Sequence, residues 1–268
     1  MKSKFGILGL CLTVMCVLNI EKAAAWGTTG HRVVAEIADR HLTKKARKNI
    51  QKIIGNEKLA YWANWADFIK SDPDPVLNTT GSWHFVNTAS NLNFEQFKVA
   101  LQGTGDNNLY KAYLRIKNEA KTNRNLPLEK KKQDLYYIIH MFGDAHQPMH
   151  VSREEDQGGN KVEVTYFGRK TNLHRVWDSE LVDAEKYSYT EYAAVLDVYN
   201  AAKYKTYKAS FEEVLFESHE LANKIYKDAE NNANLSYRYS YDYKYIMESC
   251  LLKGGIRLAN ELNEIYGK

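Results

Sequence analysis

Apolar residues recur at spacings of three and four along most of the chain, which is the period of an amphipathic helix. Val33 and Ile37 begin the first such pattern, Thr43 is placed to cap the second, and Pro148 ends the longest. The predicted helices cover residues 33–38, 43–55, 94–101, 109–120 and 128–146, with two or three more in the C-terminal third. Residues 72–75, Asp-Pro-Asp-Pro, interrupt the period and predict a loop. The pattern therefore favours a mainly α-helical protein.

One short segment alternates instead, as a β-strand does. Residues 161–167 place an apolar side chain at every second position between Gly158-Gly159 and Gly168, so we expect one arm of a small β-hairpin there. Another unusual segment, residues 236–245, holds five tyrosines, which suit either a base-stacking surface or a packed helix or loop. No repeat period is visible, and the whole pattern predicts a single helical domain with a small β-hairpin.

Composition agrees with a folded globular chain. Of the 268 residues, 44% are hydrophobic and 12% aromatic, which excludes disordered and collagen-like architectures. The 37 Lys and Arg nearly balance the 33 Asp and Glu, giving a formal net charge of +4. Charge alone therefore neither indicates nor excludes a nucleic-acid partner.

The first 25 residues differ from the rest and predict a cleaved secretory signal peptide. Lys2 and Lys4 give a basic start, the apolar run 5–17 is too short to span a bilayer, and three alanines at 23–25 suit a signal peptidase. A membrane anchor is the alternative, although no second apolar run of spanning length follows. We therefore expect a secreted or periplasmic protein whose single domain covers residues 26–268 and begins at Trp26.

Cysteine usage limits the metal chemistry that is possible. Cys11 and Cys16 lie in the predicted signal peptide, so cleavage would leave only Cys250 and allow no intrachain disulfide. Any metal ion in the remaining chain must then use nitrogen and oxygen ligands.

The histidines carry the candidate chemistry. His140 and Asp144 lie four residues apart within a predicted helix, so both side chains emerge on one face and can reach a common metal ion. His150 follows after a turn, and His174 and Asp178 repeat the four-residue spacing downstream. For each histidine taken singly, a buried structural role is the alternative.

Three further segments complete this set. Asp67 lies in Trp-Ala-Asp, His84 lies in Trp-His-Phe, and His31 ends a Trp-Gly-x-x-Gly-His segment that starts at Trp26. Cleavage before Trp26 would give this residue a free α-amine, which is itself a metal ligand when deprotonated. Carboxylates and imidazoles without thiolates are typical of a hydrolytic zinc site that keeps positions open for water.

Taken in order, these motifs resemble those of the zinc-dependent single-strand-specific nucleases of fungi, plants and bacteria. The matching segments are Trp-Gly-x-x-Gly-His, Trp-Ala-Asp, His-Phe, His-x-x-x-Asp-x-x-Gln-Pro-x-His, Gly-Gly-Asn and Asn-Leu-His-x-x-Trp-Asp. The resemblance implies a helical fold of the zinc phospholipase C and nuclease type, forming one catalytic domain with three zinc ions. It also implies hydrolysis of single-stranded DNA and RNA to 5′-phosphate products, and 3′-nucleotidase activity on 3′-mononucleotides.

The resemblance also assigns the zinc ligands. They are Asp67, His84 and His140 for one ion of a close pair, Trp26 and His31 for its neighbour, Asp144 as the bridge between the two, and His150, His174 and Asp178 for a third ion. Three divalent cations among three carboxylates would leave a positive pocket that attracts a phosphodiester. In the implied reaction, water activated by the close pair attacks phosphorus in line, so we expect Asp144 to be the most sensitive position.

Catalytic and substrate-binding residues are assigned in the same way. The expected catalytic residues are Asp67, Lys70 and Asp144, and the expected substrate-binding residues are Phe85, Asn87 and Asn160. Phe85 would stack on an unpaired base, with core packing as the alternative. Lys70 replaces an arginine of the fungal enzymes and lacks its planar fork, whereas Asn87 replaces an aspartate and leaves base preference open.

Two other functions compete with this interpretation. A zinc phospholipase C resembles these nucleases in fold and N-terminal tryptophan, but its ligand set includes a glutamate where this chain keeps the nuclease pattern. A non-catalytic zinc-binding protein of the cell envelope is the second alternative, although degenerate relatives usually lose ligands. His41, His146 and His219 match no ligand position and are expected to be ordinary surface or core residues.

Overall fold

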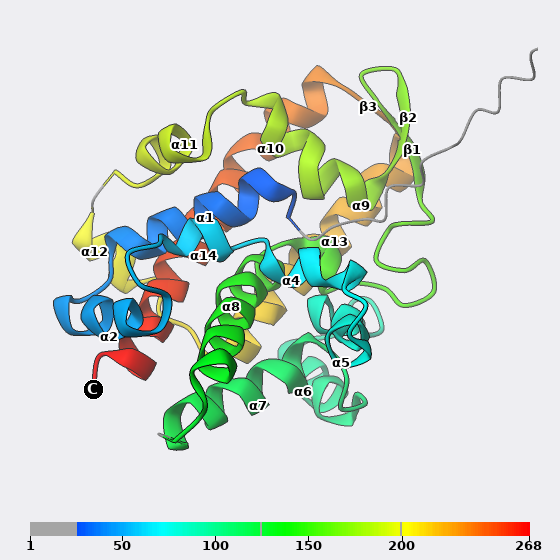
Figure 1. Ribbon diagram of the computed structural model, residues 1–268. Helices are drawn as coiled ribbons and strands as arrows, with labels where there is room; N and C mark the ends of the chain where they lie inside the picture. The colour runs from blue at the N-terminus through cyan, green and yellow to red at the C-terminus, as the bar shows by residue number, and fades with distance from the viewer. Residues whose placement is uncertain (1–25, 124, 199) are drawn as a thin grey trace, which may run out of the picture.

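The computed structural model describes residues 26–123, 125–198 and 200–268, so the predicted signal peptide lies outside the described residues. Figure 1 shows a mainly helical chain with one small sheet. In chain order the elements are α1 (Thr28–Arg40), α2 (Lys44–Ile54), α3 (Leu59–Trp62), α4 (Trp65–Phe68), η1 (Ile69–Ser71), α5 (Pro75–Asn78), η2 (Thr79–His84), α6 (Phe94–Gly103), α7 (Leu109–Thr122), α8 (Leu128–Ala145), η3 (Pro148–His150), β1 (Glu163–Tyr166), β2 (Arg169–Asn172), α9 (Leu173–Arg175), η4 (Val176–Glu180), α10 (Leu181–Ala184), α11 (Tyr189–Leu196), α12 (Ala201–Lys205), α13 (Phe211–Asn231), β3 (Asn234–Leu235) and α14 (Tyr237–Tyr266). The predicted helical class is confirmed, although the described part of the C-terminal third holds five helices, α10 to α14, rather than two or three. Within these ranges, none of the helices is long and apolar enough to cross a bilayer.

Helix boundaries follow local capping chemistry. Thr43 caps α2, because its hydroxyl accepts a hydrogen bond from the Ala46 N–H at 3.2 Å, and Gly55 follows the helix at a φ of 69°. α6 begins with a capping box in which Asn93 and Gln96 each accept a hydrogen bond from the other's backbone N–H. The cap predicted at Thr43 is therefore confirmed.

α8 lies at the centre of the helical packing. Every residue from Asp134 to Ala145 is buried, and α1, α7 and α14 pack against this helix. α1 also runs along α14, so helices from opposite ends of the described chain are neighbours (Figure 1). A helix that is enclosed on all sides places even its polar side chains in the interior. His140 and Asp144 both lie on this helix, and both side chains are therefore held in the interior of the protein.

The small sheet has the strand order β2-β1-β3. β1 and β2 form the predicted antiparallel hairpin, with Glu163 opposite Asn172 and Tyr166 opposite Arg169. Its two-residue turn, Phe167-Gly168, has positive φ at both positions, as hairpin turns that follow the strand twist require. β3 pairs with β1 in parallel over two residues, and this strand was not predicted from the sequence.

The tyrosine-rich segment forms the first turns of α14, and its five tyrosines divide between two faces of the helix. Tyr239 and Tyr243 are buried, whereas Tyr237, Tyr241 and Tyr245 are between 72% and 81% exposed. The buried Tyr239 hydroxyl accepts a hydrogen bond from the Trp177 indole N–H at 2.8 Å. Packing of a helix, one of the two alternatives for this segment, therefore accounts for the inward face.

Candidate metal centre

Three groups of side chains in the described part of the chain can hold a metal ion, because their candidate ligand atoms lie within 4.8 Å of one another. The first group is His31, His140 and Asp144; the second is Asp67, His84 and His140; the third is His150, His174 and Asp178. The structure thus brings together every predicted histidine and aspartate ligand, and the first two groups share one histidine.

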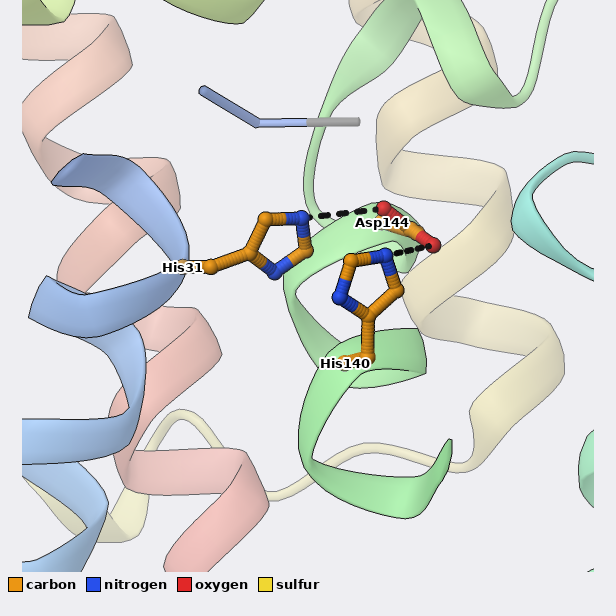
Figure 2. A group of neighbouring side chains, drawn as sticks. All are labelled: His31, His140 and Asp144. Atoms are coloured by element: carbon orange, nitrogen blue, oxygen red, sulfur yellow. Dashed lines mark ion pairs between the residues drawn. The ribbon is translucent and has the colours of Figure 1, made fainter. Parts of the chain in front are cut away.

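These side chains come from elements that are distant in sequence. α1 supplies His31, and α8 supplies His140 and Asp144 from successive turns of one face, as Figure 2 shows. The other positions are Asp67 on α4, His84 on η2, His150 on η3, His174 on α9 and Asp178 on the π-helical turn η4. α8 therefore supplies two candidate ligands, and six other elements supply one each.

Asp144 lies where the first and second groups meet. Its Oδ1 is 3.3 Å from His31 Nε2, and its Oδ2 is 3.3 Å from His140 Nε2 (Figure 2). The same Oδ2 is 3.2 Å from His84 Nδ1. The rings of His31 and His140 are stacked, with their centres 3.8 Å apart. Because the two oxygens of this fully buried carboxylate face different groups, Asp144 has the geometry that a bridging ligand requires.

Three histidines are oriented by backbone carbonyl groups. The Nδ1 atoms of His140, His150 and His174 lie 2.6–2.7 Å from the carbonyl oxygens of Ala63, His84 and Gly158, respectively. A carbonyl oxygen can only accept a hydrogen bond, so Nδ1 carries the proton and Nε2 keeps its lone pair. Metal-binding histidines are commonly oriented by such a hydrogen bond from the second ring nitrogen.

Many buried polar atoms of these groups have no hydrogen-bond partner within the described chain. They are both ring nitrogens of His31, Nε2 of His84, both carboxylate oxygens of Asp144, Nε2 of His150 and Oδ2 of Asp178. Buried polar atoms are nearly always paired, since leaving one unpaired costs about 1–3 kcal/mol. Their concentration at three clusters of nitrogen and oxygen ligands fits the binding of divalent cations.

Burial perturbs the ionisation of the side chains in the first two groups. Burial and the nearby charge of Asp67 raise the pKa of Asp144 well above its usual range. Burial and the neighbouring His140 lower the pKa values of His31 and His84, and burial lowers the pKa of His140 to about 4. The imidazoles are therefore neutral near pH 7, which is the protonation state that binds a metal ion.

In the third group, the charges of Asp178 and His174 counteract the effect of burial on each other's pKa. Burial alone would raise the pKa of Asp178, but His174 and His150 lower it to about 2. Burial would lower the pKa of His174, but the adjacent Asp178 carboxylate, 3.0 Å from its Nε2, raises it instead. The Asp178 carboxylate is thus stabilised by the two imidazoles and by the hydrogen bond that it accepts from the Gln147 amide.

Trp26, the remaining predicted ligand, belongs to none of the three groups of side chains, because its expected ligand atoms are those of the backbone. The residue is fully buried, and the adjacent Gly27 N–H donates a hydrogen bond to the Asp178 carbonyl oxygen at 2.5 Å. The start of α1 is therefore tied directly to the backbone of a candidate ligand.

The predicted catalytic lysine and substrate-binding residues surround the second and third groups. Lys70 Nζ is 2.6 Å from Asp67 Oδ1. Phe85 directly follows His84 and is 41% exposed, which excludes simple core packing of its ring. Asn87 Oδ1 accepts a hydrogen bond from the Ser152 N–H at 3.3 Å, whereas Asn160 donates to the Gln157 carbonyl oxygen at 2.9 Å.

Two residues near the site were not singled out from the sequence. A Cβ atom at Gly143 would fall 2.6 Å from His31 Cε1 and still closer to Nδ1, so only glycine allows α1 and α8 to approach here. Gln147 is fully buried and donates a hydrogen bond to Asp178. Gln147 lies inside the His-x-x-x-Asp-x-x-Gln-Pro-x-His motif, but a one-dimensional pattern does not show which side chain it contacts.

The three histidines expected to lie outside the ligand set occupy other environments. His41 pairs with Asp197 at 2.8 Å, and the buried His146 contacts the guanidinium group of Arg257 at 3.2 Å. His219 packs against Phe97 with the two rings tilted and their centres 4.8 Å apart. None of them belongs to the three groups found in the described chain.

Three groups of imidazole and carboxylate side chains that can hold metal ions are thus set in a helical fold. The family model S1/P1 Nuclease matches residues 26–267, and the chain belongs to the S1/P1 nuclease family. It is 25% identical to Endonuclease 2 of Arabidopsis thaliana over 97% of both chains. It is also 30% identical to Nuclease S1 of Aspergillus oryzae over 58% of this chain and 54% of that protein. Among solved structures, the alpha toxin from Clostridium absonum is 18% identical with a TM-score of 0.45, covering 92% of this chain and 66% of the toxin.

Proposed function

We propose that this protein is a zinc-dependent endonuclease that hydrolyses single-stranded DNA and RNA to products with 5′-phosphates, and that also removes phosphate from 3′-mononucleotides. Family membership supports nuclease activity, and the three buried ligand groups support a metal-dependent mechanism. The observation that carries the proposal is Asp144, whose two unpaired oxygens face two different groups.

The proposal assigns three zinc ions to these groups. Asp67, His84 and His140 would hold one ion, and His31 with the Trp26 amine and carbonyl group would hold its neighbour. His150, His174 and Asp178 would hold the third ion, while Asp144 would bridge the first two. Zinc bound there would lower the pKa of a bound water and polarise the phosphodiester, which supplies a nucleophile near neutral pH.

Cleavage of the signal peptide before Trp26 is part of the same proposal. Until the peptide bond before Trp26 is cleaved, the Trp26 nitrogen belongs to an amide and is a poor metal ligand. A mature protein starting at Trp26 would gain a free amine at Trp26, next to Gly27, whose N–H donates a hydrogen bond to the Asp178 carbonyl oxygen. This cleavage would accompany export to the periplasm or the medium.

The predicted substrate-binding residues near the ligand groups would select the substrate. Phe85 presents an exposed ring next to the second group, and stacking on an unpaired base contributes about 1–3 kcal/mol with little base preference. A duplex hides its base faces, so this contact favours single strands. Lys70 would place a positive charge beside Asp67, where it can contact a phosphate oxygen, and Asn87 and Asn160 would offer amide N–H groups to the nucleotide.

The test uses protein whose N-terminus has been verified as Trp26. Acid-soluble nucleotide release from single-stranded DNA is measured before EDTA, after EDTA and after zinc is restored, and mass spectrometry identifies the new ends. We expect activity to be lost and regained, with 5′-phosphate and 3′-hydroxyl ends. New 3′-phosphate ends would refute the direction of cleavage, and phosphocholine release from lecithin without nucleotide release would favour a phospholipase C.

Asp144→Asn is the variant that tests the bridge. The substitution keeps the size of the side chain but removes the charge facing both groups, so we expect nuclease activity to fall by at least ~100-fold, as loss of a critical electrostatic group does. A matched control is Asp197→Asn, because Asp197 pairs with His41 outside the three groups. Near-normal activity of Asp144→Asn would contradict the bridging role.

A further inference from the structure

Gln147 occupies a fully buried position between two candidate ligands, Asp144 and His150. Both ends of its amide are used. Its Nε2 donates a hydrogen bond to Asp178 Oδ1, and its Oε1 accepts one from the Met149 N–H at 2.6 Å. One side chain therefore joins the segment after α8 to η4, which lies some thirty residues further along the chain.

The acceptor end of the amide fixes the short helix that carries His150. Gln147 is the N-cap of η3, and the capping hydrogen bond to Met149 satisfies a backbone donor at the start of this three-residue element. The His150 N–H in turn donates to the Gln147 carbonyl oxygen at 3.0 Å. A three-residue helix has little stability of its own, so this cap helps to hold the His150 backbone in place, while the His84 carbonyl oxygen orients the His150 ring.

The donor end of the amide fixes the rotation of the Asp178 carboxylate. Oδ1 is occupied by Gln147 and is 3.4 Å from His150 Nε2. Oδ2 lies 3.0 Å from His174 Nε2 and accepts no hydrogen bond within the described chain. The amide thus occupies Oδ1 and leaves Oδ2 facing His174.

We propose that Gln147 is the positioning residue of the third group, orienting His150 through the η3 cap and Asp178 through a direct hydrogen bond. This inference rests on the proposed zinc-dependent function. Only a side chain with both a donor and an acceptor at this distance can serve both contacts. A glutamate would retain the acceptor for Met149 but face Asp178 with a second carboxylate, and an apolar residue would leave both partners unpaired in the interior.

The experiment compares Gln147→Met with Gln147→Glu, each prepared as the zinc-loaded protein starting at Trp26. Methionine keeps the volume and removes both hydrogen bonds, whereas glutamate keeps the cap and removes the donor to Asp178. Zinc per chain is measured after dialysis against a series of chelator concentrations. Because loss of a residue that orients a ligand typically weakens metal binding by 10- to 100-fold, we expect one zinc of three to be lost at chelator concentrations that the wild type resists.

A control variant and a second background separate positioning from a general effect on folding. Gln96→Met removes a glutamine from the capping box of α6, which belongs to none of the three groups, and should retain all zinc. In an Asp178→Asn background, where the group is already impaired, Gln147→Glu should cause at most a ~2-fold further change in zinc affinity. Excess zinc should restore nuclease activity to both single variants.

The outcomes distinguish this inference from the function on which it rests. Wild-type protein that shows no zinc-dependent nuclease activity would refute the proposed function. If the wild type is active, unchanged chelator resistance in either folded Gln147 variant would overturn the positioning role. If Gln147→Met does not fold, Gln147→Glu still decides the contact to Asp178, because it preserves the η3 cap.

Discussion

Gly143 gives the most direct test of how closely α1 and α8 must approach. In Gly143→Ala, the new Cβ would lie 2.6 Å from His31 Cε1, whereas an ordinary contact needs at least 3.4 Å. The shortfall of about 0.8 Å has to be absorbed by the imidazole or by a shift of α1. Metal–ligand distances tolerate only about 0.2 Å, so His31 would no longer match the geometry of the first group.

The effect on stability is small, because two contributions oppose each other. Alanine in place of glycine inside a helix stabilises it by about 1 kcal/mol, while overpacking a buried contact costs about 1–3 kcal/mol. The net change in unfolding free energy of the zinc-free protein is therefore between about zero and 2 kcal/mol of destabilisation. Zinc affinity, by contrast, should fall by at least ~10-fold.

The assay pairs chelator competition for zinc with thermal unfolding of the zinc-free protein. Gly103→Ala at the end of α6 is the matched control, because a Cβ there meets no atom within 4 Å. We expect the control to bind zinc as the wild type does. Wild-type zinc affinity in Gly143→Ala would refute the reasoning, since it would show that His31 moves freely without loss of a ligand.

Two further predictions concern substrate affinity and acid stability. Phe85→Ala should raise KM for a single-stranded oligonucleotide about 5- to 150-fold, because it removes a stacking contact. Phe85→Trp keeps an aromatic ring and should have a KM near that of the wild type. An unchanged KM for Phe85→Ala would exclude stacking. Burial would raise the pKa of Glu217, but the hydrogen bonds and charge of Arg257 lower it to about 2. A depressed carboxyl pKa stabilises the fold above the unfolded value of 4.5, and the contribution is lost as pH falls toward 2. Melting temperatures of the wild type and Glu217→Gln should therefore converge over that range, and a constant difference would contradict this linkage.

The parts of the fold that the sequence predicted are those determined by local interactions. The cap at Thr43, the helix carrying His140 and the hairpin starting near Glu163 depend on residues within a few positions of each other. β3 was missed because two residues carry no alternating pattern, and its pairing depends on β1, about seventy residues earlier. The two faces of the tyrosine segment follow helical spacing, but only tertiary packing decides which face is buried.

The same distinction applies to the site. Four-residue spacing within one helix was enough to place His140 beside Asp144. Joining His31 and Asp67 to them needed the family resemblance, since those residues come from separate elements. Gln147 and Gly143 went unassigned because their importance depends on single contacts, one to Asp178 and one to His31, which no spacing along the chain encodes.

The burial of charge explains why the ligands and the fold are linked so closely. Asp144 is fully enclosed, and among the described residues its nearest candidate partners are imidazoles whose own pKa values are depressed by burial. A protein without cations must therefore either bury an uncompensated carboxylate or take up a proton there, and both options destabilise the folded state. Metal ions remove that penalty only if the helices already hold the ligands in place. The packing that encloses α8 thus both buries the Asp144 carboxylate and holds it in a fixed position, as a preorganised site requires.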